Sequence, residues 1–396
     1  MLPAINIGLI MKKNLRVAIV GYKFMGKAHS NGWLQAARFF KPEFTPVLQV
    51  ACGRSEGPLR DFADQWGWKH IETDWRKVVE RDDVDVVDIS LPQNLHHDVA
   101  VAASRAGKHV FCEKPMALSV AEAENMLRVA EKAGVKHYLN HNYRRCPAVR
   151  LARQLIDSGA IGRVFHWRGA YQQDWIVDPD FPLTWHLRKE ISGSGPHGDL
   201  NSHSVDLAHY LVGDIRTVAC LTAQFIPERP LPGQGAATFS AGASPSDARK
   251  GQVTVEDSSL MTVEFANGAV GSFEATRFAP GRKNHLTFEI YGSEGSLAFD
   301  LERMNELQFY SRNDPEHLRG FRTILATEGC HPYIAHWWPP GHIIGYEHGF
   351  VHAVADFIAA IEGDTPIEPN FADGLKCMKV LEAGVRSAAT GQRVRL

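Results

Sequence analysis

The sequence predicts two folds in one chain: an α/β Rossmann domain with a doubly wound parallel sheet, then an α+β domain with an open-faced, mainly antiparallel sheet. Three observations predict this. From Leu15 to about residue 143, short β-branched runs alternate with helical patterns, which indicates βαβ units. Beyond about residue 160, strands are joined by hairpin turns such as Asn267-Gly268. A glycine-containing loop follows the first predicted strand, where a nucleotide-binding turn would lie.

The first half supplies regular alternation. We expect strands at 15–21, 46–53, 84–90 and 108–113, and helices at 24–39, 96–107 and 119–134. Ser119 and Gly134 are typical of the start and end of a helix, and Gly107 closes the one before. The strands therefore lie parallel, with helices on both faces of the sheet.

The second half predicts hairpins around Asn267-Gly268 and around residues 292–295, an inserted small-residue loop at 229–251, and helices at 349–363 and near 373–390. We assign residues 1–143 to the dinucleotide-binding domain and residues 144–396 to a domain for substrate binding and oligomerisation. The helices from about residue 345 are expected to pack back on the first domain.

The composition is that of an ordinary globular protein, with 396 residues, a formal net charge of −2 and 44% hydrophobic residues. Runs of Lys and Arg are no longer than pairs, so no nucleic-acid surface is expected. Six separated cysteines with no Cys-x-x-Cys pair predict reduced thiols in a cytoplasmic protein. The first ten residues lack the charge order of a signal peptide, so none is expected, and both Met1 and Met11 stay open as the start of translation. No apolar stretch approaches the roughly 20 residues of a membrane helix.

The loop GYKFMGKAHS, residues 21–30, keeps two of the three glycines of a dinucleotide-binding turn. Gly21 can form the tight turn and Gly26 can let helix and strand pack closely, whereas Lys23 replaces the glycine that lets the backbone approach a pyrophosphate. Lysine there could instead face a phosphate. We predict cofactor contacts from Gly21, Lys23, Phe24, Met25 and Gly26.

The end of the second strand bears on the choice of cofactor. An acidic residue there usually binds the ribose of NAD, but this chain reads CGRSE, with Arg54 after the strand. An arginine can neutralise the 2′-phosphate of NADP, which favours NADP slightly. Glu56 is close enough in sequence to serve NAD, so NAD(P) is the predicted cofactor.

The segment CEKP, residues 112–115, follows a predicted strand at the carboxyl end of the sheet, where ligands of such folds bind. A lysine in that position, Lys114, can exchange a proton or hold a reacting oxygen beside a nicotinamide.

These motifs, in this order, resemble those of the Gfo/Idh/MocA oxidoreductases over essentially the whole chain from about residue 15. The family hallmark Glu-Lys-Pro is matched by Glu113, Lys114 and Pro115. DISLPQNLHH, residues 88–97, is similar to the family's cofactor segment, with Gln93 replacing the usual asparagine, and NYRRCPAV, residues 142–149, is similar to the segment that leaves the nucleotide domain. The resemblance adds cofactor contacts from Leu91, Pro92, Gln93, His96, Glu113, Lys114 and Asn142.

The family's acidic residue and histidine are matched within residues 192–213 by Asp199 and His203, which are four apart and so are expected on one helical face. The resemblance implies hydride transfer between a sugar or polyol carbon and the nicotinamide. Lys114 and His203 would hold the reacting oxygen, one of them exchanging its proton, while Asp199 would orient the substrate or the histidine. Which of the two is the base stays open.

Residues 171–195 resemble a branch of the family that contains levoglucosan dehydrogenase and related glycoside 3-dehydrogenases. The resemblance implies a sugar or glycoside substrate, with pyranose C3 as a candidate carbon, bound by Lys114, Trp185, Asp199 and His203. It also implies a homodimer or homotetramer paired through the open sheet. Trp175 and the segment HWWPPGH, residues 336–342, offer further aromatic faces, with Gln173, His186 and Arg188 as candidate hydroxyl partners.

Three other functions stay open from the residues. The side chains of His197, His203, Asp206 and His209 could bind a metal in a hydrolase, but zinc patterns such as His-Glu-x-x-His are absent and no metal is predicted. An enzyme that oxidises a glycoside transiently with bound NAD, and so consumes no cofactor, would need the same Lys114. A nucleotide-sensing protein without turnover would not need Lys114, Asp199 and His203 together.

Overall fold

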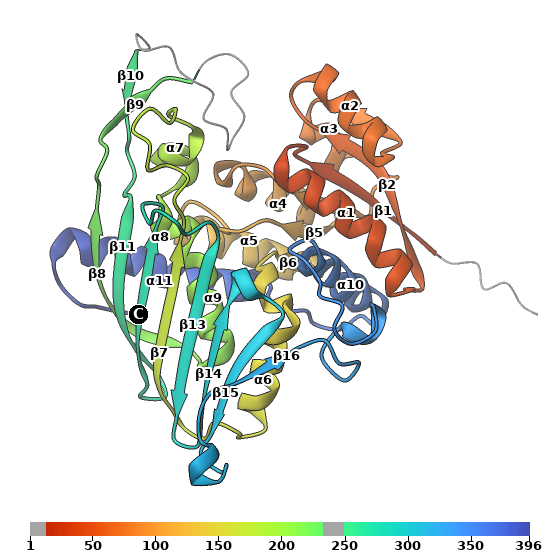
Figure 1. Ribbon diagram of the computed structural model, residues 1–396. Coiled ribbons are helices and arrows are strands. Elements are labelled where there is room, and N and C mark those ends of the chain that lie inside the picture. Colours follow the sequence, from red (N-terminus) through yellow and green to blue (C-terminus); the bar gives the residue numbers. More distant parts are fainter. Residues whose placement is uncertain (1–12, 233–248) are drawn as a thin grey trace, which may run out of the picture.

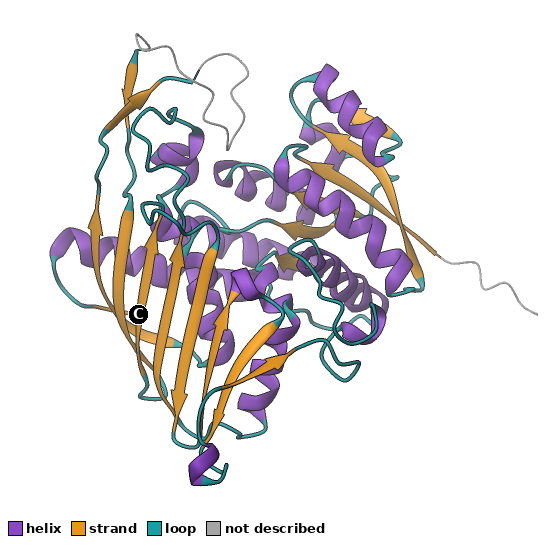
Figure 2. Ribbon diagram, viewed as in Figure 1, coloured by secondary structure: helices purple, strands orange, loops and turns teal. Residues whose placement is uncertain are grey.

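The computed structural model describes residues 13–232 and 249–396. The candidate starts Met1 and Met11 and most of the predicted loop at 229–251 lie outside these residues. Figure 1 shows the two predicted halves side by side, and Figure 2 shows that strands of the second half form one broad sheet.

The first half is a six-stranded parallel sheet in the order β3-β2-β1-β4-β5-β6. Its strands are β1 (Lys13–Val20), β2 (Phe44–Cys52), β3 (His70–Glu72), β4 (Val86–Ile89), β5 (His109–Cys112) and β6 (His137–Leu139). Its helices are α1 (Phe24–Phe39), α2 (Glu56–Trp66), α3 (Trp75–Val79), α4 (His96–Arg105) and α5 (Val120–Ala133). Since the chain leaves β1 toward β2 and later returns beside β1 as β4, the carboxyl ends of β1 and β4 form the switch point at which sheets of this kind bind ligands.

The second half contains a nine-stranded sheet in the order β16-β15-β14-β13-β7-β12-β11-β8-β17. The strands are β7 (Val164–Gln172), β8 (Ile215–Ala223), β11 (Ser258–Phe265), β12 (Val270–Thr276), β13 (His285–Gly292), β14 (Gly295–Asp300), β15 (Glu306–Ser311), β16 (Arg322–Leu325) and β17 (Val394–Arg395). Strands β7 and β12 pair parallel, and the other pairs are antiparallel. A separate two-stranded ribbon joins β9 (Glu228–Pro230) and β10 (Lys250–Gln252). The predicted fold class is confirmed.

Helices cover one face of the large sheet (Figure 1). They are α6 (Pro147–Asp157), α9 (Asn201–Leu211) and α11 (Phe371–Thr390), which contact β15, β7 and β8 respectively. The short helices α7 (Lys189–Ser192) and α8 (Pro196–Asp199) lead into α9.

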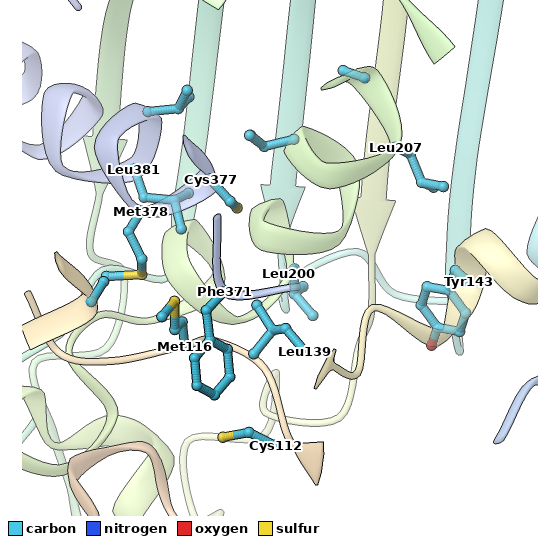
Figure 3. Packing of buried hydrophobic residues seen from close by; sticks show 14 of the residues in the cluster. Cys112, Met116, Leu139, Tyr143, Leu200, Leu207, Phe371, Cys377, Met378 and Leu381 are labelled. Carbon is cyan, nitrogen blue, oxygen red and sulfur yellow. The ribbon is translucent and has the colours of Figure 1, made fainter. Parts of the chain in front are cut away.

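The C-terminal helices join the two halves. Helix α10 (His348–Glu362) packs on α1, and Val354 and Phe357 share an apolar cluster with Trp33. Figure 3 shows Met116 and Leu139 of the first half, Leu200 before α9, and Phe371, Cys377, Met378 and Leu381 of α11 in one cluster. A Cβ on Gly374 would lie 2.6 Å from Leu139 and 2.7 Å from Met116, so this close packing requires glycine. The chain segments that carry Lys114 and Asp199 are therefore anchored to the same core.

One local expectation was wrong. Asp199 and His203 do not lie on a single regular helix, because α8 ends at Asp199 and α9 begins at Asn201. The amide of His203 donates to the carbonyl of Leu200 at 3.1 Å, three residues back, so the chain is overwound at the junction. The two side chains accordingly have different surroundings.

Candidate active site

The loop after β1 has the shape that a dinucleotide requires. Gly21 has φ +112°, and a Cβ there would lie 2.4 Å from the carbonyl oxygen of Ser90 on the neighbouring strand end. A Cβ on Gly26 would lie 2.4 Å from the carbonyl oxygen of Gly21. Both glycines are thus required for the turn and for the approach of α1 to it.

Lys23 occupies the N-cap of α1 with φ −83°, so its backbone does not adopt the left-handed conformation that favours glycine. No side chain caps this end of α1, and the helix dipole favours an anion at this N-terminus. At this end of the helix Lys23 and Phe24 are exposed and Met25 is half-buried. The loop therefore fits a bound pyrophosphate.

Arg54 is exposed directly after β2. Glu56, the alternative ribose partner, lies on the first turn of α2 and pairs with Arg60 at 2.8 Å. Because both side chains are exposed, the fold leaves either one able to turn toward a ribose.

The loops after β4 and β5 are tied together by the segment 91–96. The ring nitrogens of His96 lie 2.9 Å from the carbonyl oxygens of Pro115 and Leu91, and the amide of Gln93 donates to the carbonyl of Ala117. Gln93 and His96, predicted as cofactor residues, thus hold the loop that carries Lys114. Leu91 and Pro92 form the half-exposed edge of this segment, and Asn142 lies buried in the turn after β6 against Gly349.

Lys114 reaches from the first half to the second. Its ammonium donates to Oδ1 of Asp199 at 2.6 Å and to the backbone oxygen of Asp199 at 3.2 Å. Arg277, which sequence reasoning did not identify, donates from Nη2 to the other carboxylate oxygen at 2.6 Å. Burial opposes the charge of Asp199, but Lys114 and Arg277 hold the pKa of this carboxyl well below its usual range. Asp199 is an anion between two cations.

His203 lies beside Tyr143, with ring centroids 4.3 Å apart, and near Tyr171 and His141, each at 5.8 Å. Burial, with the charge of Lys114 and the proximity of His141, holds the pKa of His203 well below its usual range, so the imidazole is neutral. Its Nδ1 is buried without a hydrogen-bond partner in the described residues. His203 is therefore a neutral imidazole with one unpartnered ring nitrogen among the described residues.

A row of hydrogen-bonded side chains lies beside His203 and runs from Tyr143 to Trp175. The hydroxyls of Tyr143 and Tyr171 lie 3.0 Å apart, and Tyr171 donates to Oδ1 of Asn284 at 2.6 Å. The amide of Gln173 donates to the same oxygen at 3.1 Å, and the indole N–H of Trp175 donates to Gln173 at 2.8 Å. This row fixes the aromatic rings beside His203.

Glu113, predicted as a cofactor residue, has its carboxylate buried behind the loop. It accepts from Asn140 at 2.6 Å and lies 2.8 Å from Nε2 of His29, whose Nδ1 lies 2.7 Å from Asp88. Burial disfavours an imidazolium, but the two carboxylates outweigh it and raise the pKa of His29 to about 10. The backbone N–H of Lys114 donates to Glu113 at 3.2 Å. Glu113 therefore supports the turn that carries Lys114.

Other polar residues considered as site groups have different partners. Asp206 accepts from Nε and Nη2 of Arg144 at 2.8 and 2.7 Å, and the ring nitrogens of His197 lie 2.8 Å from Ser259 and the carbonyl of Leu381. Among the described residues, a possible three-ligand cation site is His285, Asp300 and Glu302. There, however, Glu302 accepts backbone amides of Lys283 and Asn284, an ordinary turn role.

The aromatic candidates separate into two groups. Trp175 lies over Arg277, with the guanidinium carbon 5.1 Å from the ring, and half-buried Trp185 stacks on His186 at 3.7 Å. Trp337, by contrast, packs on Phe39 with centroids 4.2 Å apart at the far end of α1. The expectation that HWWPPGH faces a sugar is therefore not supported by its packing.

A nucleotide turn, a lysine at the adjacent strand end and a neutral histidine define an oxidoreductase of the nicotinamide-dependent class. The comparisons agree with this class. The profile described as "Oxidoreductase family, NAD-binding Rossmann fold" matches residues 15–141, and that of the "GFO/IDH/MocA C-terminal domain" matches residues 149–298. The chain belongs to the Gfo/Idh/MocA family of oxidoreductases, and the predicted family is confirmed.

Individual relatives match over nearly the full chain. Levoglucosan dehydrogenase of Pseudarthrobacter phenanthrenivorans is 42% identical over 95% of this chain and 97% of its own length. The crystal structure of an oxidoreductase domain protein from Kribbella flavida is 48% identical, with a TM-score of 0.91 over 97% of this chain and 99% of that one. A levoglucosan dehydrogenase complex with NADH and levoglucosan is 40% identical, with a TM-score of 0.91 over the same shares. Among the described residues, no helix is long and apolar enough to cross a membrane.

Proposed function

We propose that this chain is an NAD(P)-dependent sugar dehydrogenase that transfers hydride between nicotinamide and a hydroxyl-bearing carbon of a sugar or glycoside. We propose that this carbon is C3 of a pyranose. The observation that carries the proposal is the position of the Lys114 ammonium, held 2.6 Å from Asp199 at the end of β5, beside a glycine loop that fits a dinucleotide. Similarity to levoglucosan dehydrogenase supports a sugar as the substrate.

Lys114 is the group proposed to hold the reacting oxygen. An ammonium has three N–H donors, and Lys114 uses two of them on the Oδ1 and backbone oxygen of Asp199. One donor is left for a substrate hydroxyl. As the hydroxyl loses its proton, the ammonium stabilises the negative charge that develops on oxygen.

The proton from the hydroxyl is proposed to pass to His203. A general base must be unprotonated at working pH, and burial keeps this imidazole neutral with Nδ1 free. Lys114, in contrast, already pairs with the carboxylate of Asp199 at 2.6 Å. Bound NAD(P) supplies the acceptor for the hydride, while the loops after β1, β4 and β5 orient both reactants and exclude water.

The proposal is tested by incubating the purified protein with NAD or NADP and a panel of pyranosides that includes levoglucosan, following reduced nicotinamide by absorbance. Products are then assigned by NMR. Formation of one reduced cofactor per 3-keto sugar is expected. Cleavage of a glycosidic bond without net cofactor reduction, or oxidation at another carbon, would contradict the proposal.

Arg54 gives a separate prediction about the cofactor. If Arg54 binds the 2′-phosphate of NADP, Arg54→Ala should weaken NADP binding by ten- to a hundredfold and NAD binding much less, because the lost contact is charge-assisted. Both dissociation constants are measured by calorimetry. Lys69→Ala, another exposed change in the same domain, is the control. Equal losses for NAD and NADP would rule out this role.

The open face of the large sheet gives a prediction about assembly. The paired residues Leu221 and Leu260 are 65% and 47% exposed on this face, and we propose that a second copy of the chain covers them. Leu260→Asp should shift the mass measured by light scattering to that of a single chain. Leu318→Asp, at an exposed position outside the sheet, should leave the mass unchanged. An unchanged mass for Leu260→Asp would contradict the proposed interface.

A further inference from the structure

Arg277 is a buried arginine at the centre of the candidate site. It follows β12 directly, its side chain is 1% exposed, and its Nη2 donates to Oδ2 of Asp199 at 2.6 Å. The ring of Trp175 lies over its guanidinium. Arg277 therefore faces the same carboxylate as Lys114, from the side of the second sheet.

The guanidinium has more donors than this contact uses. Nε and Nη1 of Arg277 are buried and have no hydrogen-bond partner in the described residues. Arg144, an equally buried arginine, uses both Nε and Nη2 on the two oxygens of Asp206. A buried donor without a partner is costly, so a role in ion pairing alone does not account for the orientation of Arg277.

The two cations share one carboxylate. Lys114 binds Oδ1 and Arg277 binds Oδ2 of Asp199, so the donor groups of the two side chains meet at a single small group. Donors so close together match oxygen atoms on neighbouring carbons of a substrate. A sugar presents such a pair wherever two adjacent ring carbons carry hydroxyls.

We propose that Arg277 determines specificity by binding a second hydroxyl, on a carbon adjacent to the one oxidised, so that the enzyme requires a vicinal diol. The inference rests on the proposed function, since it takes the hydroxyl at Lys114 as the reacting one. The carboxylate of Asp199 accepts from either hydroxyl, and the ring of Trp175 packs against the guanidinium, whose carbon lies 5.1 Å from the ring centroid.

The test is a cycle that pairs enzyme variants with substrate analogues. The best sugar from the panel and its monodeoxy analogues at the two neighbouring carbons are compared on the wild type, Arg277→Met and Arg277→Lys. Wild type should lose ten- to a hundredfold in kcat/KM on one deoxy analogue. Arg277→Met should lose a similar factor in kcat/KM on the full sugar and little more on that analogue. The ratio of kcat/KM for the full sugar to kcat/KM for the analogue, which measures the preference, therefore falls to near one.

Arg277→Lys keeps a cation for Asp199 but lacks the Nε and Nη1 donors, so it should also lose the preference while retaining NAD binding. Arg150→Met is the control, because Arg150 donates to Tyr210 and not to Asp199, and it should keep the preference. An undiminished preference in both Arg277 variants would overturn the inference.

Failure of the proposed function would look different, because wild type would then reduce no cofactor with any sugar. In that event the same cycle is measured as binding of the sugars to the NAD-saturated protein by calorimetry. Loss of the diol preference in the Arg277 variants is again expected, and its persistence, or absence of any preference in wild type, overturns the inference.

Discussion

Replacing Lys114 with alanine should lower kcat by about a thousandfold or more, because the change removes the donor that holds the reacting oxygen and stabilises its developing charge. Binding of NAD should change by less than tenfold, since the glycine loop and the first turn of α1 are untouched. The fold should also survive. Asp199 keeps its second cation, Arg277, at 2.6 Å, so no buried carboxylate is left unpaired.

Stopped-flow and steady-state measurements of NAD reduction give kcat, and fluorescence titration gives the dissociation constant of NAD. Lys108→Ala is the matched control, because Lys108 lies in the same domain and, in the part of the chain that the structure describes, donates to the backbone oxygen of Arg81. That variant should retain full kcat. Turnover of Lys114→Ala within tenfold of wild type would remove lysine from the mechanism.

Helices and strands that a local sequence pattern marks could be predicted, and these include most elements of the first half. The helix expected at 24–39 and the observed α1 (Phe24–Phe39) coincide, since the glycine turn marks where the helix begins and its apolar periodicity shows how far it continues. Strands β3 and β6 were not predicted, because three residues are too few to show alternation.

In the site, the residues on named motifs were predicted and the residues brought in by tertiary packing were not. Lys114, Asp199 and the neighbouring His203 were anticipated, but Arg277 was not, although a signal exists. Along β12, Phe273 and Ala275 point to the helix-covered face, and Arg277 continues that alternation. A charged residue at a strand position that alternation places on the buried face needs a buried partner. That partner is Asp199, and only the fold identifies it.

His29 illustrates the same limit. It lies inside α1, where periodicity predicts only a core position, and its two carboxylate partners lie 59 and 84 residues away in sequence. The pairing depends on β4 and β5 being neighbours in the sheet. No pattern in the sequence therefore indicates that the charged side chain of His29 supports the turn before Lys114.

His29→Leu should destabilise the protein by about 3–5 kcal/mol, because it leaves the buried carboxylates of Asp88 and Glu113 without their cation. His352→Leu is the control, since His352 is equally buried but neutral, with its pKa lowered to about 3 mainly by burial. It accepts from the indole of Trp337 at 2.8 Å. Its loss should cost only about 1–3 kcal/mol, the price of a neutral hydrogen bond.

The buried group of His29, Asp88 and Glu113 also predicts how the stability of the protein depends on pH. The pKa of His29 in the folded protein, about 10, lies above its ordinary value of 6.5. Its contribution is therefore complete below pH 6.5 and is lost as the pH rises toward 10, by up to about 1.4 kcal/mol per pH unit. Urea unfolding of the wild type between pH 7 and 10 should show this decline.

A variant that carries His29→Gln, Asp88→Asn and Glu113→Gln has no charge at this position and should lose less stability over the same pH range. If His29→Leu costs no more than His352→Leu, or if wild type and the uncharged variant decline equally, His29 is not a buried cation. If the prediction is correct, the turn that carries Lys114 is stabilised by the positive charge of His29 on α1. Helix α1, which follows the nucleotide loop, would then also support Lys114, since Glu113 connects His29 to the backbone of Lys114.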